Sequence, residues 1–198
     1  MSRLHQVVER ATDEFEKYEY AKAREIIENF FWNDLCDNYL EIVKTRIYGD
    51  LDNIKNYLED PESADITKLQ NSANYTVYHI FLNLLKLFSP YTPHITEEIY
   101  QLMFSKESAK IDSIHSSGSW PDIAKLNEDQ ESLELGQITL DILSKIRKEK
   151  SDQNISIKTQ IPKLQIDIPK KHQDKINNDF ILDLKSVTNS EKLEINWV

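Results

Sequence analysis

The chain has 198 residues, a formal net charge of −10 and 39% hydrophobic residues, which is enough for one large domain, or one domain with a smaller appendage, built on a core that needs no disulfides. Its three glycines are scattered, which excludes the glycine-rich turns of a Walker loop or a dinucleotide fingerprint. The acidic balance argues against a general nucleic-acid coat, and the single cysteine, Cys36, predicts a reduced, cytoplasmic setting.

The N-terminal part of the chain is predicted to be helical and free of targeting signals. It lacks the apolar core of a signal peptide, and no run of the sequence is long and apolar enough to cross a membrane. We therefore expect no membrane partner. Apolar residues spaced three and four apart between Leu4 and Tyr18 predict the first helix.

The second predicted helix, residues 20–46, is rich in aromatic side chains. At 3.6 residues per turn it has one broad apolar face, made of Ile26, Ile27, Phe30, Phe31, Leu35, Tyr39, Ile42 and Val43. Polar side chains occupy the opposite face. Lys44, Arg46 and the nearby Gly49 are typical of a helix C-terminus.

Two further long helices complete a predicted bundle. A short helix is expected at 50–58, and the helix at 68–88 is apolar nearly all round, as in a helix buried among others. Thr92 and Pro93 predict the N-cap and first position of a fourth helix, with Glu97 and Glu98 in its early turns. Its buried side is predicted to be Ile95, Ile99, Leu102 and Met103. Residues 1–112 thus read as an antiparallel helical bundle.

The rest of the chain predicts a connector and a small α/β subdomain. Residues 113–130 read as a connector, in which Trp120 fills a gap in the bundle. In the subdomain, 131–198, a fifth helix ends in a basic cluster, and alternating apolar residues at 164–168 and 193–197 predict two strands around a helix at 172–186. Such a crossover pairs the strands in parallel. The predicted fold class is mainly α, with a two-stranded sheet at its end.

No catalytic or metal-binding constellation is evident. His94 and Glu98 lie four apart, but a metalloprotease helix needs a second histidine there. Cys36 has no neighbouring base that would activate it as a nucleophile. The serines around Gly118 do not form a strand–turn–helix elbow. We expect no catalytic residue, no metal and no cofactor in this chain.

Two groups of residues are candidates for RNA recognition. The second helix combines Trp32 and Tyr39 with Lys44, Arg46 and Tyr48, and aromatic rings can stack on bases while cations hold phosphates. The fifth helix ends in a cluster of cations, Lys145, Arg147, Lys148 and Lys150. The alternative is that the aromatics are core residues and the cations only complement helix C-termini.

Several segments, taken in order and spacing, resemble one family. They are residues 20–23 (Tyr-Ala-Lys-Ala), 31–41 (Phe-Trp-Asn-Asp-Leu-Cys-Asp-Asn-Tyr-Leu-Glu), 87–100 (Leu-Phe-Ser-Pro-Tyr-Thr-Pro-His-Ile-Thr-Glu-Glu-Ile-Tyr), 113–115 (Ser-Ile-His) and 120–121 (Trp-Pro). Together they resemble the C-terminal part of valyl-tRNA synthetases, a branch of the class I enzymes that include the isoleucyl, leucyl and methionyl synthetases. The resemblance implies an anticodon-binding bundle that holds the anticodon stem-loop of valine tRNA.

The resemblance also has gaps. The His-Ile-Gly-His-like and Lys-Met-Ser-Lys-Ser-like motifs of the class I active site do not occur, so the chain resembles a domain excised from a larger enzyme. The catalytic domain, with ATP and Mg²⁺, and the editing domain are then missing partners. An asparagine-rich anticodon-reading helix and a C-terminal coiled-coil arm, known in the family, are also missing.

The tRNA-binding candidates that residue type and position suggest are Trp32, Asn33, Asp37, Lys44, Arg46, Lys145, Arg147, Lys148 and Lys150. The alternative function is a helical module that docks onto protein domains without binding RNA by itself, and the equivalent domain of an isoleucyl-type enzyme is the alternative within the family.

Overall fold

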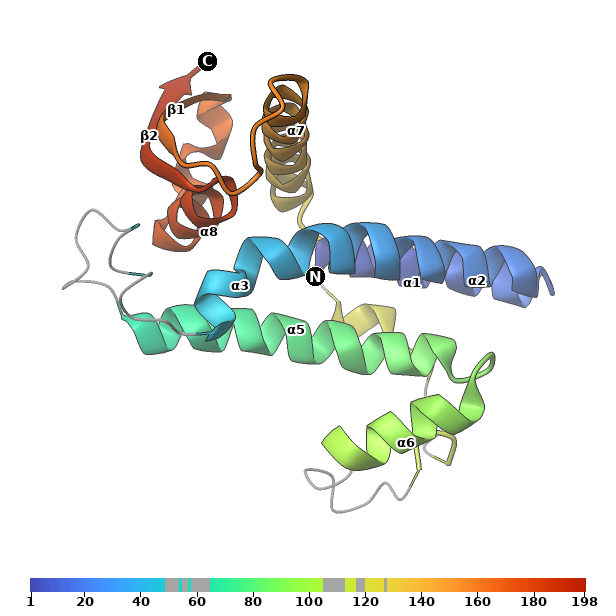
Figure 1. Cartoon of the computed structure of the whole chain (residues 1–198). Coiled ribbons are helices and arrows are strands. Elements are labelled where there is room, and N and C mark those ends of the chain that lie inside the picture. The colour runs from blue at the N-terminus through green and yellow to red at the C-terminus, as the bar shows by residue number, and fades with distance from the viewer. Residues whose placement is uncertain (49–53, 55–56, 58–64, 105–112, 117–119, 127) are drawn as a thin grey trace. The chain divides into compact units, whose positions relative to one another are not determined.

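The computed structural model describes residues 1–48, 54, 57, 65–104, 113–116, 120–126 and 128–198 (Figure 1). The chain forms two compact units: one comprises residues 1–37 and 74–129, and the other residues 38–73 and 130–198. These two units do not coincide with the expected division at residue 112, because residues 38–73 group with the C-terminal residues 130–198.

The first unit is helical. Its α1 (Ser2–Glu16) and α2 (Tyr20–Asn29) pack together through buried aliphatic side chains, Leu4, Val7, Val8 and Ala11 on α1 and Ala23 and Ile27 on α2. The turn between the two helices places Tyr18 in the left-handed region, with φ of 64°. Both helices confirm the sequence prediction.

The predicted helix at 20–46 is one uninterrupted element with a change of winding in its middle. After α2 come the π-helix η1 (Phe30–Tyr39) and α3 (Leu40–Tyr48). In a π-helix the hydrogen bonds join residues five apart, whereas five residues of an α-helix make about 1.4 turns and point elsewhere. Phe30 and Leu35, five apart, are both buried. The predicted apolar face is confirmed, but uniform α-helical winding is wrong.

The helix α5 (Ile66–Phe88) runs through both units, close to its predicted bounds. In the first unit it packs on α6 (Pro93–Met103) through a cluster of Leu85, Tyr100, Phe104 and Ile114. Thr92 is the N-cap residue of α6 and Pro93 its first residue, as predicted. The hydroxyl of Thr92 donates to the Phe88 carbonyl (3.3 Å) and does not cap the helix.

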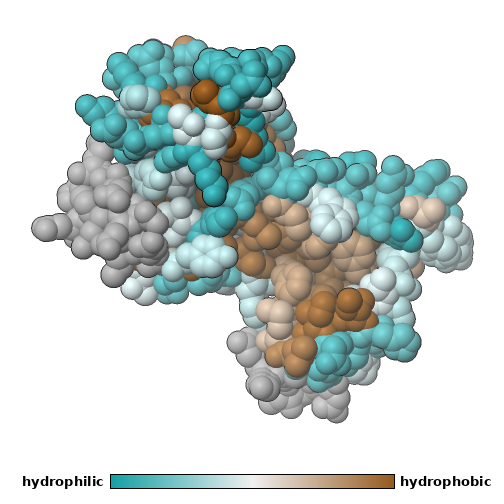
Figure 2. Space-filling model, in the orientation of Figure 1, coloured by the Kyte–Doolittle hydropathy of each residue, from teal (hydrophilic) through white to brown (hydrophobic). Residues whose placement is uncertain are grey.

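The predicted buried side of α6 is wrong at three of its four positions. Ile95, Leu102 and Met103 are exposed, with 59%, 68% and 57% of their surface accessible, and only Ile99 is half-buried. The helix instead turns Thr96 and Tyr100 inward. Figure 2 shows a hydrophobic patch on the surface over α6.

Two short segments of the predicted connector are tied to the first unit. Trp120 packs on Phe15, with 5.0 Å between ring centroids, and its Nε1 donates to Thr12 Oγ1 at 2.7 Å, as expected for a residue that fills a gap in the bundle. The carboxylate of Glu97 accepts from Ser113 Oγ (2.8 Å) and from the Ile114 amide (3.0 Å). Glu97, in the early part of α6, therefore anchors this segment.

The second unit contains a two-stranded parallel sheet. Strands β1 (Ile161–Ile168) and β2 (Ser190–Trp197) pair from Ile161 opposite Ser190 to Ile168 opposite Trp197. The inward residues Ile166 and Ile168 pack with side chains from α7 (Gln130–Asp152) and α8 (Asn178–Thr188). The predicted crossover and its parallel pairing are confirmed.

The helix predicted at 172–186 is two elements. A 3₁₀ turn, η4 (Lys170–Lys175), is followed by α8, because Ile176 is extended and the side chain of Asn177 caps α8 by accepting from the Phe180 amide (3.0 Å). Of the helix predicted at 50–58, only Ile54 and Tyr57 fall within the described residues; Ile54 is buried against Leu69 and Leu182. Among the helices described, none is both long and apolar enough to traverse a bilayer.

Candidate nucleic-acid interface

An exposed indole marks one side of η1. Trp32 is 59% exposed, and its ring meets the half-buried Phe31 edge to face at 4.8 Å. Phe31 in turn contacts Phe88, with 6.0 Å between centroids. Trp32 is thus a surface residue that contacts a neighbouring ring. The alternative that Trp32 and Tyr39 are core residues does not hold for Trp32, while Tyr39 is half-buried. Such a ring can stack on an unpaired base.

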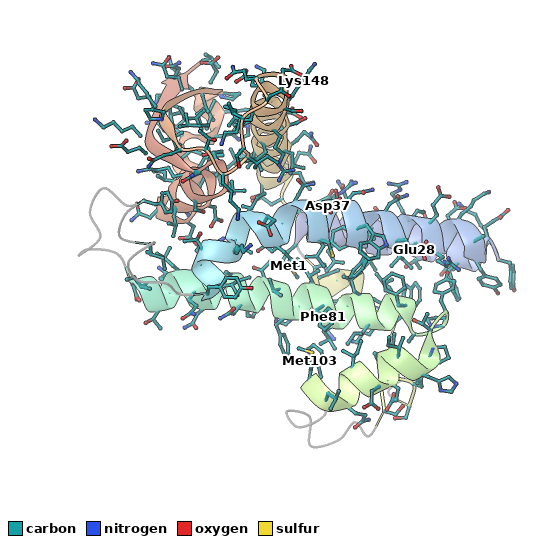
Figure 3. The ribbon with its side chains drawn as sticks, in the orientation of Figure 1. Met1, Glu28, Asp37, Phe81, Met103 and Lys148 are labelled. Atoms are coloured by element: carbon teal, nitrogen blue, oxygen red, sulfur yellow. The ribbon has the colours of Figure 1, made fainter. Side chains whose placement is uncertain are left out.

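Asn33 and Asp37 are exposed on the same element. The side-chain amide of Asn33 donates to Asn29 Oδ1 at 3.5 Å and is of a type that hydrogen-bonds base edges. Asp37, labelled in Figure 3, is an acid that would repel phosphate. Within an RNA contact it could only accept a hydrogen bond from a base.

The structure gives Arg46 a different place from the expected one. Its side chain is buried, and Nε and Nη2 donate to the two carboxylate oxygens of Asp183 at 2.8 and 2.6 Å. Nη1 donates to Asp179 Oδ2 and Ser72 Oγ, both at 2.9 Å. The guanidinium joins α3 to α8 within the second unit, so we remove Arg46 from the RNA-binding set.

Lys150 is likewise directed inward. Its ammonium donates to the carbonyls of Ile157 (2.8 Å), Thr159 (2.7 Å) and Thr188 (3.4 Å), which fixes the chain between α7 and β1. Burial lowers the pKa of Lys150. This side chain is also removed from the set.

The remaining cations of the cluster on α7 are at least partly exposed. Lys145 and Lys148 are exposed, three residues apart, and therefore neighbours on the helix surface; Lys148 is labelled in Figure 3. Neither has an ion-pair partner among the described residues. Between them Arg147 is half-buried and donates to Asn38 Oδ1 at 3.4 Å. Lys44, by contrast, pairs with Glu41 at 3.3 Å.

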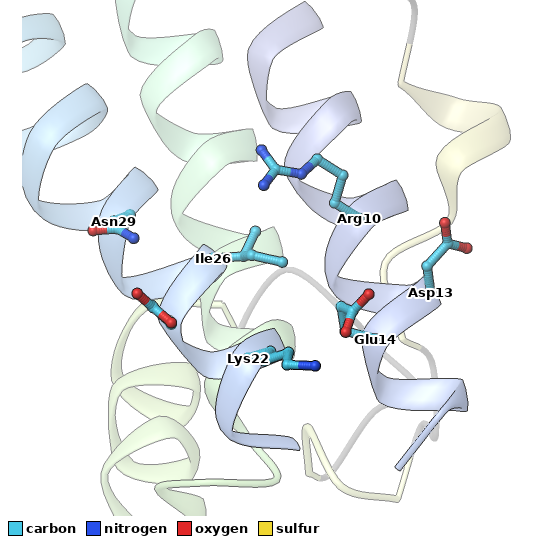
Figure 4. Close-up of a pocket in the computed structure, with 7 residues that line it drawn as sticks. Arg10, Asp13, Glu14, Lys22, Ile26 and Asn29 are labelled. Atoms are coloured by element: carbon cyan, nitrogen blue, oxygen red, sulfur yellow. The ribbon is translucent and has the colours of Figure 1, made fainter. Parts of the chain in front are cut away.

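An open pocket of about 440 Å³ lies between α1 and α2 (Figure 4). It is lined by Arg10, Asp13, Glu14, Lys22, Glu25, Ile26 and Asn29. Three carboxylates outnumber its two cations, and Lys22 also lies 3.5 Å from Glu19. The charge of this pocket does not suit a phosphate.

Among the described residues weighed for catalysis, Cys36 is not activated and Ser116 is engaged with the backbone. Burial and the neighbouring Asp37 raise the pKa of the Cys36 thiol, which disfavours the thiolate. Within the described ranges there is no group of three or more His, Cys, Asp or Glu side chains that could hold a metal. Ser116 donates to the Ser113 carbonyl (3.0 Å), while residues 117–119 lie outside the described residues.

Sequence reasoning missed the exposed side of α5. Tyr75 is 64% exposed on a helix that was predicted to be buried nearly all round. The available signal is electrostatic: no aspartate or glutamate occurs between Asp65 and Glu97 in a chain of net charge −10. An acid-free stretch of this length contributes no negative charge of its own that would repel a polyanion.

Comparison with known proteins places the chain in a class. Residues 1–167 match the family described as the anticodon-binding domain of tRNA ligase. The chain belongs to this family.

Among curated proteins the similar ones are valine–tRNA ligases. Those of Wolbachia sp. subsp. Brugia malayi (strain TRS) and Wolbachia pipientis wMel are 37% and 38% identical over 194 residues, covering 98% of this chain and 20% of each enzyme. The enzyme of Rickettsia conorii is 38% identical, with 21% of its length covered. The chain thus spans about a fifth of the length of these relatives.

Proposed function

We propose that this chain is the anticodon-binding part of a valine–tRNA ligase and that it holds the anticodon stem-loop of valine tRNA. The observation that carries the proposal is the family match over residues 1–167. Similarity to valine–tRNA ligases along 98% of the chain supports valine tRNA as the ligand.

In this proposal the second unit binds phosphates through Lys145 and Lys148, whose charges are exposed and unpaired among the described residues. Arg147 and Lys44 are secondary contacts, because each already has a protein partner. In the first unit, Trp32 stacks on a base, and Asn33 and Asp37 hydrogen-bond to base edges.

The proposed role is binding without bond chemistry. The parent enzyme would join valine to its tRNA with ATP and Mg²⁺, and we assign these cofactors to the catalytic part outside these 198 residues. The catalytic and editing domains are the proposed protein partners.

The test of phosphate binding is a salt titration. Removing the charges of Lys145 and Lys148 in the double variant Lys145→Ala/Lys148→Ala should weaken binding of the valine-tRNA anticodon stem-loop. It should also lower the slope of log affinity against log salt by about one for each phosphate that the variant no longer neutralises. Fluorescence anisotropy at several salt concentrations measures both.

The matched control is Lys163→Ala/Lys192→Ala, which removes two exposed lysines from the sheet of the same unit. It should leave the slope at the wild-type value. A stem-loop with an altered anticodon, titrated at one fixed low salt, tests base recognition. If the folded wild-type chain bound neither stem-loop detectably, the proposal would be refuted.

Interdomain docking is a second candidate function, supported by one specific observation. Ile95, Leu102 and Met103 expose an apolar side of α6 where a soluble domain seldom leaves large side chains clustered. We propose that this side faces another domain of the synthetase. Substitutions there should leave stem-loop binding by the isolated chain unchanged, which separates the two functions.

A further inference from the structure

The exposed tyrosine of α5 has the features of a stacking platform. We propose that Tyr75 stacks on an unpaired base of the bound RNA, an inference that rests on the proposed function and adds a contact to those of Trp32, Lys145 and Lys148. Tyr75 lies in the first unit, on the part of α5 that follows residue 73.

Tyr75 is the outer end of a series of ring contacts that reaches the core. Its centroid is 4.2 Å from that of His79, which lies 5.3 Å from Tyr78. Tyr78 contacts Phe104 at 4.9 Å, and Phe104 is buried and stacks with Tyr100. The exposed ring is therefore held by its contact with His79, so that less side-chain freedom is lost when a ligand packs on it.

The charged residues of α5 itself do not oppose RNA. No acidic residue occurs on α5, whose charged residues are Lys68 and Lys86. Exposed tyrosines elsewhere have acidic neighbours; Tyr18, for example, lies between Glu16 and Glu19. An aromatic ring on a helix without acids can accept a base without bringing its phosphates against carboxylates of that helix.

A purely structural role does not account for the position. Tyr75 is 64% exposed, so its ring contributes little to the core, and a polar side chain would satisfy the helix equally well. The ring contact with His79 explains how Tyr75 is oriented but leaves most of its surface open.

The experiment uses the anticodon stem-loop of valine tRNA with 2-aminopurine at one unpaired loop position at a time, because stacking on an aromatic ring changes the emission of this base. With the wild-type chain we expect a marked emission change at one position. Tyr75→Ala should abolish that change and weaken binding by about tenfold, whereas Tyr75→Phe, which keeps the ring, should preserve both.

Two readouts separate stacking from other effects. Tyr75→Ala should leave the salt slope unchanged, because the variant neutralises as many phosphates as the wild type, and should keep the wild-type Tm. Tyr18→Ala, which removes another exposed ring of the same unit, should leave both emission and affinity unchanged.

If the wild-type chain binds and Tyr75→Ala binds equally well with the same emission, the inference is wrong and the proposed function stands. If the wild-type chain does not bind, both fail.

Discussion

At the scale of single residues, the guanidinium of Arg46 faces two carboxylates, those of Asp179 and Asp183. One positive charge cannot balance both acids, and Asp183 lies in a buried position. Burial, only partly opposed by Arg46, raises the pKa of Asp183 to about 7, and the neighbouring Asp179 adds repulsion in the same direction. Asp183 therefore keeps its proton at pH values between about 4 and 7, where an exposed aspartate has lost it.

This proton makes stability depend on pH. Between the unfolded pKa of 3.8 and the folded pKa of about 7, the native chain binds more protons at Asp183 than the unfolded chain does. Its contribution to stability is complete below the unfolded pKa and is lost as pH rises through the folded one, by up to about 1.4 kcal/mol per pH unit.

Asp183→Asn removes this titration. Urea unfolding at intervals from pH 4.5 to 7.5 should give a free energy of unfolding that falls less steeply with pH in Asp183→Asn than in the wild type. Asp141→Asn, at an exposed aspartate, should behave like the wild type. Parallel curves for the wild type and Asp183→Asn would contradict the assignment.

Arg46 itself is expected to be structural. Arg46→Met leaves the buried carboxyl group of Asp183 without its cation and should lower the free energy of unfolding by roughly 3–5 kcal/mol, as measured by urea unfolding at pH 7. Lys44→Met, which breaks an exposed pair on the same helix, should change it by less than about 1 kcal/mol. An equal, small effect of both variants would show that Arg46 is not a structural centre.

At the scale of elements, α6 has apolar residues on two sides, of which only one is buried. Thr96 and Tyr100 face inward, while Leu102 and Met103 are exposed. The double variant Leu102→Ser/Met103→Ser should therefore change the free energy of unfolding by less than about 1 kcal/mol. Leu85→Ala, in the cluster beneath α6, should lower it by about 2–5 kcal/mol. A large destabilisation by the first variant would mean that this side of α6 is covered in the folded chain.

Periodicity predicted the elements well where a single contact surface decides burial. The helix predicted at 68–88 and the strands predicted at 164–168 and 193–197 are present, and each extends a few residues beyond its predicted N-terminal end. It failed at α6 because a pattern of apolar residues does not say which of two sides a helix buries. Periodicity also failed at residues 170–178, where one helix was predicted. The side chain of Asn177 caps α8, and this local hydrogen bond separates α8 from the preceding η4.

At the scale of the whole molecule, the net charge is negative, and only some elements lack acids or expose cations that could contact RNA. The chain carries net charge −10, yet α5 has no acid and α7 exposes lysines that are unpaired within the described part of the chain. Residue type and position suggested Lys145 and Lys148 as phosphate contacts, and both side chains are exposed. Residue type and position could not separate these from Arg46 and Lys150, whose partners, Asp183 and the Ile157 and Thr159 carbonyls, are set by tertiary structure.

The π-helical winding of Phe30–Tyr39 constrains the length of this segment as well as its composition. Each residue added to or removed from a helix turns every later side chain by about 100° around the axis. A single deletion between Phe30 and Leu35 would therefore take Leu35 off the buried side that it shares with Phe30. Insertions and deletions in this stretch should be selected against, even where individual exposed side chains such as Asn33 can be exchanged.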